Sequence, residues 1–215
     1  MPPKFDFNHT TQLDTIELMT SRSSRIDFDV ADGLHLIVEP HAPGVFRLRC
    51  AQANLLGENT PTARARAVAE MLLARQEAVG ESVFEPREGG DGWRLTQGDV
   101  VLDIQTDPLR FSLSRAGEVV LRSQLSEHTA AIGYSALDDA ALATWTVGFE
   151  LQADESVYGL GETPGDMNRR GEAIVSDDPE HRALPLAWSP RGWGVYANTM
   201  RRVEHGVGGD PDPSA

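Results

Sequence analysis

The stretch GWRLTQGDVVLDIQTDPLRFSLSRAGEVVL, Gly92 to Leu121, decides the fold class of this 215-residue chain. Within it, Val100, Leu102 and Ile104 fall on one side of an extended backbone. In the run Arg110–Arg115, apolar and polar residues alternate in the same way. Successive side chains of a strand point to opposite faces, so each run offers one face to a core and one to water. The stretch therefore predicts paired, half-buried strands.

Glycines separate these strands at the spacing of hairpins. Gly98 precedes the second strand, and Gly117 precedes the last. Glycine adopts the positive φ that tight hairpin turns require. Similar short runs occur at Arg25–Val30, Leu34–Glu39 and Val45–Cys50. Short strands with turns at this spacing predict an antiparallel β-sandwich or barrel.

The second half of the chain repeats the pattern. In TWTVGFEL, Thr144 to Leu151, the residues Trp145, Val147, Phe149 and Leu151 are predicted to share one face. Three more strands are predicted at Leu184–Trp188, Gly194–Thr199 and Arg201–Val207.

One segment departs from this pattern. Thr62–Val79 is rich in Ala, Leu, Arg and Glu, which are strong helix formers, and Gly80 follows it. We therefore expect one helix, about 62–79, inserted into an N-terminal β-sandwich domain of residues 1–205. Residues 206–215 are rich in Gly and Pro and are predicted to form a linker. They fit either a frayed terminus or a connection to further protein.

The charge of the chain excludes some partners. Its 33 acidic and 19 basic residues give a net charge of −14. Nucleic acids and anionic membrane surfaces require clustered positive charge, so neither is expected as a partner. Neutral sugars and small molecules remain open. The N-terminus has no apolar signal and no stretch is long enough to span a membrane, so a cytoplasmic location is predicted.

Few residues suggest chemistry of their own. The six histidines do not have zinc-binding spacing, and no glycine-rich phosphate loop precedes a helix. The adjacent pairs Asp138-Asp139 and Asp177-Asp178 are poor acid–nucleophile couples, because neighbours on a strand diverge. Cys50 is the single cysteine and is expected to be a half-buried strand residue. We predict no catalytic residue, no metal site and no cofactor.

Four motifs in the last third of the chain form a recognisable series. They are YGLGE at Tyr158–Glu162, NRRG at Asn168–Gly171, LPL at Leu184–Leu186 and RGWGV at Arg191–Val195. Their order and spacing resemble the N-terminal domain of glycoside hydrolase family 31, which contains α-glucosidases and α-xylosidases. The resemblance covers about residues 83–203 well and the first part weakly. It implies an all-β, antiparallel sandwich of the galactose-mutarotase type.

The resemblance also implies a larger enzyme. In the family, a (β/α)8 barrel follows this domain and carries both catalytic aspartates, so the barrel would be a partner of this chain and carbohydrate its substrate. Asp166, in the run Asp-Met-Asn, superficially resembles the family's nucleophile motif. Because a Pro-Gly turn precedes it and Arg169-Arg170-Gly171 follow it, we interpret Asp166 as a turn residue.

Some residues match positions with roles in the family. Asp177 matches an aspartate on a loop that reaches the sugar pocket of the barrel, although Asp177 or Asp178 ahead of Pro179 is also an N-cap pattern. Domain docking is expected of Asn168, Arg169, Arg170 and Gly171, with one arginine reaching carbonyls or a carboxylate of the barrel.

Two tryptophans could also contact sugar. Trp188 and Trp193 could stack on sugar faces, but packing in a core or a domain interface is the stronger expectation for both.

Three functions are compatible with these observations. The first is an accessory domain of a retaining α-glycosidase, inactive by itself. The second is a free-standing carbohydrate-binding sandwich or a mutarotase-like sugar epimerase, although the acid and base that an epimerase needs are not evident. The third is a structural interaction module.

Overall fold

A computed structural model describes the chain over residues 11–13, 15–22, 25–30, 33–52, 82–124, 131–135, 144–176, 182–199 and 202–208. The chain divides into two compact units. The sandwich unit is described between Thr11 and Phe149, and the C-terminal unit between Glu150 and Gly208. Each unit is considered by itself below.

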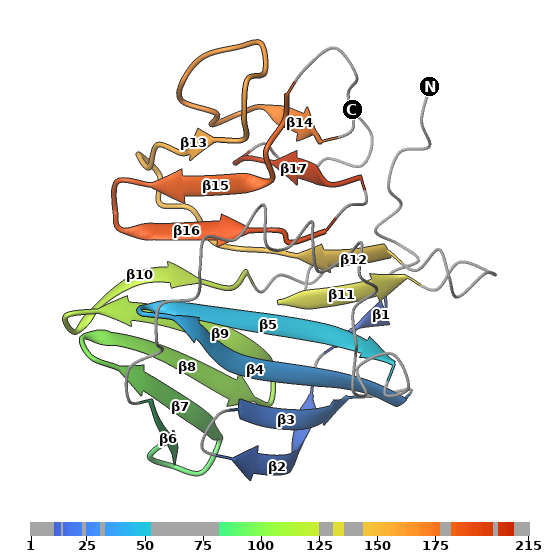
Figure 1. The fold of residues 1–215 in the computed structure, drawn as a ribbon, viewed down its shortest axis with the longest axis vertical. Helices are drawn as coiled ribbons and strands as arrows, with labels where there is room; N and C mark the ends of the chain where they lie inside the picture. The colour runs from blue at the N-terminus through green and yellow to red at the C-terminus, as the bar shows by residue number, and fades with distance from the viewer. Residues whose placement is uncertain are drawn as a thin grey trace. The chain divides into compact units, whose positions relative to one another are not determined.

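The sandwich unit contains three antiparallel sheets (Figure 1). The four-stranded sheet has the order β2 (Ile16–Arg22), β3 (Arg25–Val30), β4 (Leu34–Ala42), β5 (Val45–Gln52). The five-stranded sheet has the order β10 (Glu118–Arg122), β9 (Leu109–Arg115), β8 (Val100–Thr106), β7 (Gly92–Gln97), β6 (Val83–Pro86). The three-stranded sheet has the order β1 (Thr11–Gln12), β11 (Ile132–Ser135), β12 (Thr144–Val147).

The strands expected in the Gly92–Leu121 stretch are confirmed. Leu95 of β7 lies opposite Leu102 of β8, and Ile104 of β8 lies opposite Phe111 of β9. Because residues that lie opposite each other share a face, these four side chains form one apolar surface. Gly98, in the turn between β7 and β8, has φ +61°, the left-handed region that glycine enters without strain.

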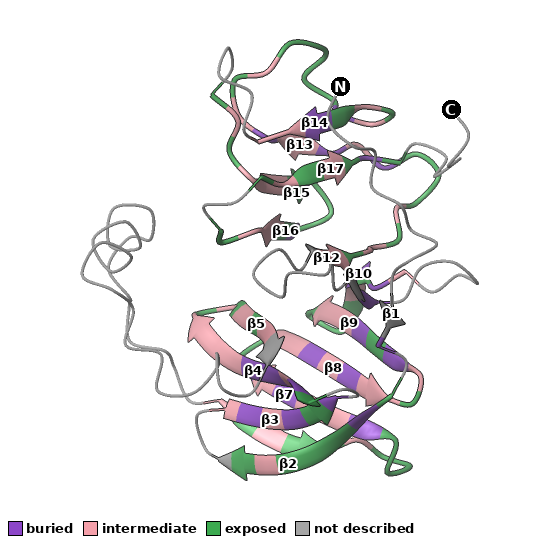
Figure 2. Cartoon of the chain, turned by 90° about the vertical axis from the view of Figure 1, so that its right-hand side faces the viewer, coloured by how far each residue is buried: buried purple, intermediate pink, exposed green. Residues whose placement is uncertain are grey.

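The core lies between the four-stranded and five-stranded sheets. Alternate positions of β3, β8 and β9 are buried, and β4 is buried at Leu34 and from Leu36 to Val38, as the purple bands in Figure 2 show. The four-stranded sheet contributes Ile16, Ile26, Phe28, Val30, Leu34, Leu36 and Val38, and Leu13, directly after β1, belongs to the same core. The five-stranded sheet contributes Leu95, Leu102, Ile104, Leu109 and Phe111. Burial of this apolar surface is the main driving force for closing two such sheets on each other.

One predicted strand is shorter than expected. β12 ends at Val147, and Phe149 makes only an isolated bridge to Ser123. Trp145 packs against the core, but Val147 is 53% exposed. The prediction that Trp145, Val147, Phe149 and Leu151 share one buried face is therefore wrong. β12 is an edge strand, and the chain passes into the C-terminal unit after Phe149.

The predicted fold class is confirmed. Every strand pairing in the described residues is antiparallel, and these residues contain no α-helix. The predicted helix at 62–79 lies outside the described residues. In the part of the chain that is described, no helix is long and apolar enough to cross a bilayer.

Cys50 lies on the core side of β5. It faces Leu36, a core residue, across the β4–β5 ladder, and burial raises the pKa of the Cys50 thiol to about 12. At pH 8, about one such thiol in 10⁴ is ionised, against roughly one in four for an ordinary cysteine with a pKa of about 8.5.

We expect Cys50 to react with dithionitrobenzoate at least about 100-fold more slowly in the native chain than in denaturant, because the thiolate is the reactive species. Absorbance of the released thiol at pH 8 gives both rates, and the Cys50→Ser variant gives the blank. Equal rates in the two conditions would contradict the assignment of Cys50 to the core side.

The C-terminal unit is built from two small sheets joined by long loops (Figure 1). The three-stranded sheet has the order β13 (Tyr158–Gly159), β15 (Leu186–Ser189), β16 (Trp193–Tyr196). The two-stranded sheet pairs β14 (Ala173–Val175) with β17 (Glu204–Gly206). Gly206–Gly208, at the start of the predicted linker, are described as part of this unit, and Val207 is buried. The predicted boundaries of the domain and the linker stay predictions.

Candidate functional site

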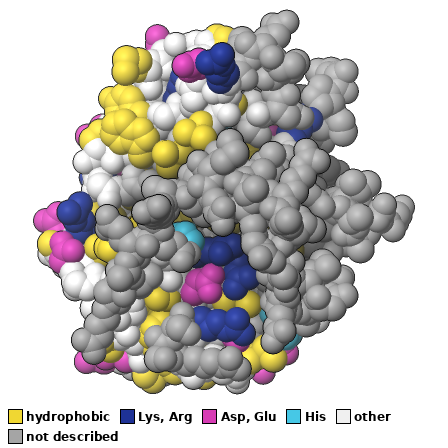
Figure 3. Space-filling view, in the orientation of Figure 1, with side chains coloured by type: hydrophobic (Ala, Val, Ile, Leu, Met, Phe, Trp, Pro, Cys, Tyr) yellow, Lys and Arg dark blue, Asp and Glu magenta, His cyan; other side chains and the backbone are white. Residues whose placement is uncertain are grey.

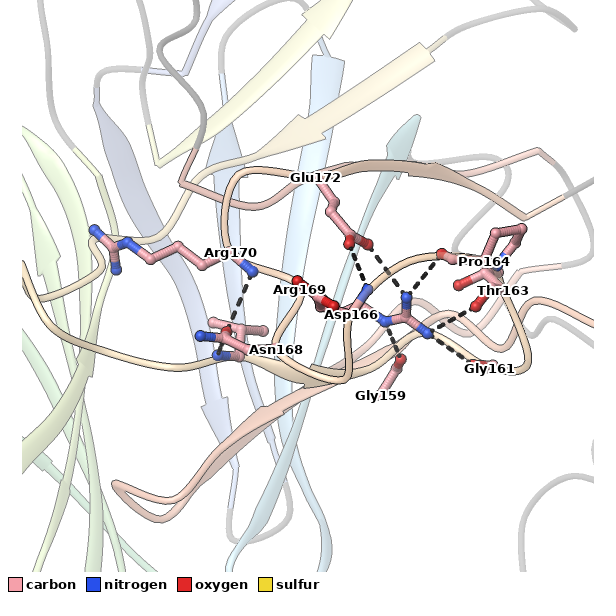
Figure 4. Close-up of polar contacts among 10 residues, drawn as sticks. Gly159, Gly161, Thr163, Pro164, Asp166, Asn168, Arg169, Arg170 and Glu172 are labelled. Carbon is pink, nitrogen blue, oxygen red and sulfur yellow. Dashed lines mark hydrogen bonds and ion pairs between the residues drawn. The ribbon is translucent and has the colours of Figure 1, made fainter.

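The loop between β13 and β14 is organised around the side chain of Arg169. Arg169 is only 6% exposed, and its guanidinium group donates five hydrogen bonds within 3.0–3.4 Å (Figure 4). The acceptors are the backbone carbonyls of Gly159, Gly161, Thr163 and Pro164 and the carboxylate of Glu172. A single buried cation thus holds together the whole turn that contains the YGLGE motif. Because one side chain satisfies four backbone carbonyls at once, this contact fixes the shape of the loop.

Asn168 joins the loop to the segment just before β13. Its side-chain oxygen accepts hydrogen bonds from the backbone N–H groups of Val157, at 3.1 Å, and Arg170, at 3.3 Å. Its side-chain amide donates to the hydroxyl of Ser156 at 3.2 Å. This is the pattern of an asparagine that replaces backbone partners in a turn.

Arg170 points away from the Arg169 cluster (Figure 4). Its guanidinium group donates to the carbonyls of Gln152, at 2.8 Å, and Glu155, at 2.9 Å. The backbone N–H of Gly171 donates to the carbonyl of Val207 at 2.6 Å. In the structure, the carbonyls and the carboxylate that Arg169 and Arg170 reach therefore belong to their own unit. Docking by Asn168, Arg169, Arg170 and Gly171 stays a prediction.

The other residues that the sequence analysis singled out are Asp177, Asp166, Trp188 and Trp193. Asp177 lies outside the described residues. Asp166 is exposed between two bends, and its backbone N–H donates to the Glu172 carboxylate at 3.1 Å. Trp193 is buried, whereas Trp188 is 45% exposed. No group of three or more metal-ligating side chains converges within the described ranges.

Two carboxylates with structural roles were missed by the sequence analysis. Glu172 accepts from both Arg169 and the backbone of Asp166, and the three-residue spacing from Arg169 was an available signal. Glu155 is 5% exposed, and its carboxylate accepts from the Trp193 indole at 2.6 Å. No local pattern predicts that Glu155 is buried, because its Trp193 partner is 38 residues away in the sequence.

Several groups stabilise the charged form of Glu155. Burial by itself would raise the pKa of Glu155. The backbone N–H of Gln152 donates to its carboxylate at 3.0 Å, and the Ser189 hydroxyl and the Trp193 indole also donate. Together with the charge of Arg191, these hydrogen bonds outweigh burial and hold the pKa of Glu155 below its ordinary value.

A lowered carboxyl pKa predicts a defined pH dependence. The unfolded chain binds the proton more tightly, so the ionised form of Glu155 stabilises the fold above its unfolded pKa, near 4.3. That contribution disappears as the pH falls through the lower folded pKa. We expect Glu155→Gln to lower the free energy of unfolding by about 1–2 kcal/mol at pH 7, with a smaller difference from wild type at pH 3.

Urea unfolding of both proteins at pH 7, 5 and 3 measures this difference. The matched control is Glu150→Gln, because Glu150 is exposed; it should cost less than about 0.5 kcal/mol at each pH. A loss at Glu155→Gln that is the same at pH 7 and pH 3 would refute the role given to the charge.

Comparisons with known proteins agree with this architecture. The family model of the glycosyl hydrolase 31 N-terminal galactose mutarotase-like domain matches residues 35–205. An α-xylosidase from a soil metagenome, complexed with xylose, superposes with a TM-score of 0.70 at 19% identity, over 87% of this chain and 29% of that one. A dextranase from Flavobacterium johnsoniae gives a TM-score of 0.67 at 14% identity, over 92% and 24%.

A third solved structure is similar to this chain as well. An α-xylosidase from Xanthomonas citri gives a TM-score of 0.64 at 20% identity, over 86% of this chain and 19% of that one. This chain therefore spans less than a third of the length of the three enzymes. No curated protein matches the chain.

The antiparallel sandwich and the loop-rich β unit beside it in the chain define a β-sandwich domain of the galactose-mutarotase-like class. The chain belongs to the glycosyl hydrolase 31 N-terminal galactose mutarotase-like domain family.

Proposed function

We propose that this chain is an accessory domain of a retaining α-glycosidase, and that it packs on a catalytic (β/α)8 barrel and lends a loop to the sugar pocket. The observation that carries the proposal is the family match over residues 35–205. The length of the similar solved structures supports it as well, because this chain covers only 18–29% of those longer chains. A barrel and its carbohydrate substrate are the partners that this function requires.

The β13–β14 loop suits a role as a docking surface. Its shape is fixed internally by Arg169 and Asn168, so little conformational entropy would be lost when a partner binds it. The four predicted docking residues would act by holding this shape, since the described contacts of both arginines lie inside their own unit. Met167, an 82% exposed residue of the loop, is available for apolar contact.

Asp177, which follows β14 in the sequence and not the β13–β14 loop, is the residue through which this chain would reach the sugar. An ionised carboxylate accepts hydrogen bonds and so would select sugar hydroxyls as donors. In an assembly of this chain with its barrel, we expect Asp177→Ala to lower kcat/KM by about 10–100-fold, the range for losing a hydrogen bond to a charged group. Hydrolysis of nitrophenyl α-glucoside and α-xyloside measures the effect.

Two controls accompany this test. Glu150→Ala should leave kcat/KM unchanged, because Glu150 is exposed and lies outside the β13–β14 loop. The purified 215-residue chain should hydrolyse neither substrate. Hydrolysis by the chain alone, or a genome that encodes no Trp-x-Asp-Met-Asn-Glu barrel motif after or beside this gene, would count against the proposal.

A further inference from the structure

The two faces of the β13–β15–β16 sheet differ in burial. On one face, Ser189 and Trp193 lie opposite each other and are only 3% and 7% exposed. The other face, called the aromatic face, follows from the strand registers. It consists of Tyr158, Leu186, Trp188, Gly194 and Tyr196. Trp188 is 45% exposed and Gly194 is exposed, while the other three are half-buried.

Two rings of the aromatic face lie against each other. The centroids of Tyr158 and Trp188 are 5.0 Å apart, with their planes tilted by 32°. Across the β15–β16 ladder, Trp188 faces Gly194, which has no side chain. No side chain of residue 194 therefore covers the sheet beside the indole. This position is called the open floor. In Figure 3, hydrophobic side chains gather over the region where Figure 1 draws β13 and β15.

The chemistry of this face selects an uncharged ligand with apolar ring faces. None of its five residues carries a formal charge, although 24% of the chain is Asp, Glu, Lys or Arg. The net charge of −14 also opposes anionic ligands. The faces of aromatic rings are electron-rich and attract the polarised C–H groups that cover one side of a pyranose ring. The hydroxyl groups of the sugar can meanwhile stay in water, so stacking leaves no polar group unpaired.

We propose that the aromatic face binds neutral saccharides, with Trp188 as the stacking platform and Gly194 as the open floor beside it. Trp193 has no such role, because it is buried and its indole N–H is engaged by Glu155. The inference is independent of the barrel and of Asp177. If the aromatic face did not bind saccharides, the proposed accessory role would therefore still stand. If the accessory role were refuted, the proposed saccharide binding would still stand.

The test is a titration of the purified 215-residue chain with isomaltotriose, maltotriose and xylotriose, followed by calorimetry and by tryptophan fluorescence. We expect a Kd of about 1–10 mM for at least one trisaccharide, as suits one exposed stacking contact. Trp188→Ala should weaken binding at least about tenfold, and Trp188→Phe should retain part of it.

Two further variants make the test specific. Gly194→Val places a side chain on the open floor while keeping the indole, and it should also weaken binding at least about tenfold. An added Cβ at Gly194 comes no closer than 3.6 Å to its neighbours, so the fold should tolerate it. Val83→Ala removes a 49% exposed side chain of β6, outside the aromatic face, and should leave the Kd unchanged.

Three results would overturn the proposal. The first is no binding of any trisaccharide at 50 mM, about five times the upper end of the expected Kd. The second is binding that survives both Trp188→Ala and Gly194→Val. The third is a concentration-dependent dimer of the chain that the Trp188→Ala substitution dissociates and that sugar does not affect. Such a dimer would assign the aromatic face to a protein contact. Far-UV circular dichroism confirms that each variant is folded.

Discussion

Replacement of Arg169 by methionine should destabilise the C-terminal unit by about 3–5 kcal/mol, the range for removing one partner of a buried charged network. The change keeps the length and apolar stem of the side chain and deletes the guanidinium group. Four backbone carbonyls and the Glu172 carboxylate then lose a donor in a site where Arg169 is 6% exposed. Urea unfolding followed by tryptophan fluorescence and hydrogen exchange of the 157–172 loop measure the loss.

Two variants calibrate the effect. Arg115→Met removes an arginine whose ion pair with Asp99 is about 60% exposed on both sides, and it should cost less than about 0.5 kcal/mol. Arg169→Lys keeps the charge but cannot supply the same planar set of donors, so it should recover only a minor part of the stability. If Arg169→Met changed the free energy of unfolding by less than 1 kcal/mol, the loop would not depend on this residue.

Replacement of Gly161 by alanine should destabilise the same unit by about 3–5 kcal/mol, from backbone strain and steric overlap together. Gly161 has φ +84°, a conformation that residues with a Cβ rarely adopt. An added Cβ would lie 2.2 Å from the carbonyl oxygen of Arg182 and 2.4 Å from the backbone nitrogen of Leu184. Backbone atoms cannot rotate away, so the Arg182–Leu184 segment would have to move.

Gly171→Ala separates the two contributions. Gly171 has nearly the same backbone, with φ +86°, but no atom lies within 4 Å of an added Cβ. This variant should therefore show the strain alone, about 1–2 kcal/mol. Thermal unfolding of both variants gives the comparison. Equal losses at Gly161 and Gly171 would mean that the close approach to Arg182 has no energetic weight.

The sequence predicted the hairpins from Gly92 to Leu121 because their pairing is local. Consecutive strands joined by short glycine turns have their register set by the turn and by the alternation of Leu102, Ile104 and Phe111. The same reasoning was wrong for TWTVGFEL. There the alternation continues through Phe149, but the strand ends at Val147. Where a strand ends depends on its neighbours in the sheet, which a local pattern does not contain.

For the candidate site, the motifs identified the correct loop but not how it is held. YGLGE and NRRG were recognised as a series, and the structure joins them through the Arg169 guanidinium group. The sequence analysis expected an arginine to reach acceptors of a partner domain. The described acceptors of Arg169 lie in β13 and the loop after it, because the chain curls back so that the carbonyls of Gly159, Gly161 and Thr163 surround this side chain.

The two tryptophans show what each level of information determines. The period-two alternation, the positions of turns, the charge and the family motifs could be read from the sequence alone, because these depend on residues close together along the chain. Trp188 and Trp193 looked alike at that level. Only the tertiary structure separated them, by placing Trp193 against the buried Glu155 and leaving Trp188 on an open face. Burial depends on which distant segments pack against a side chain, and that is a property of the folded chain alone.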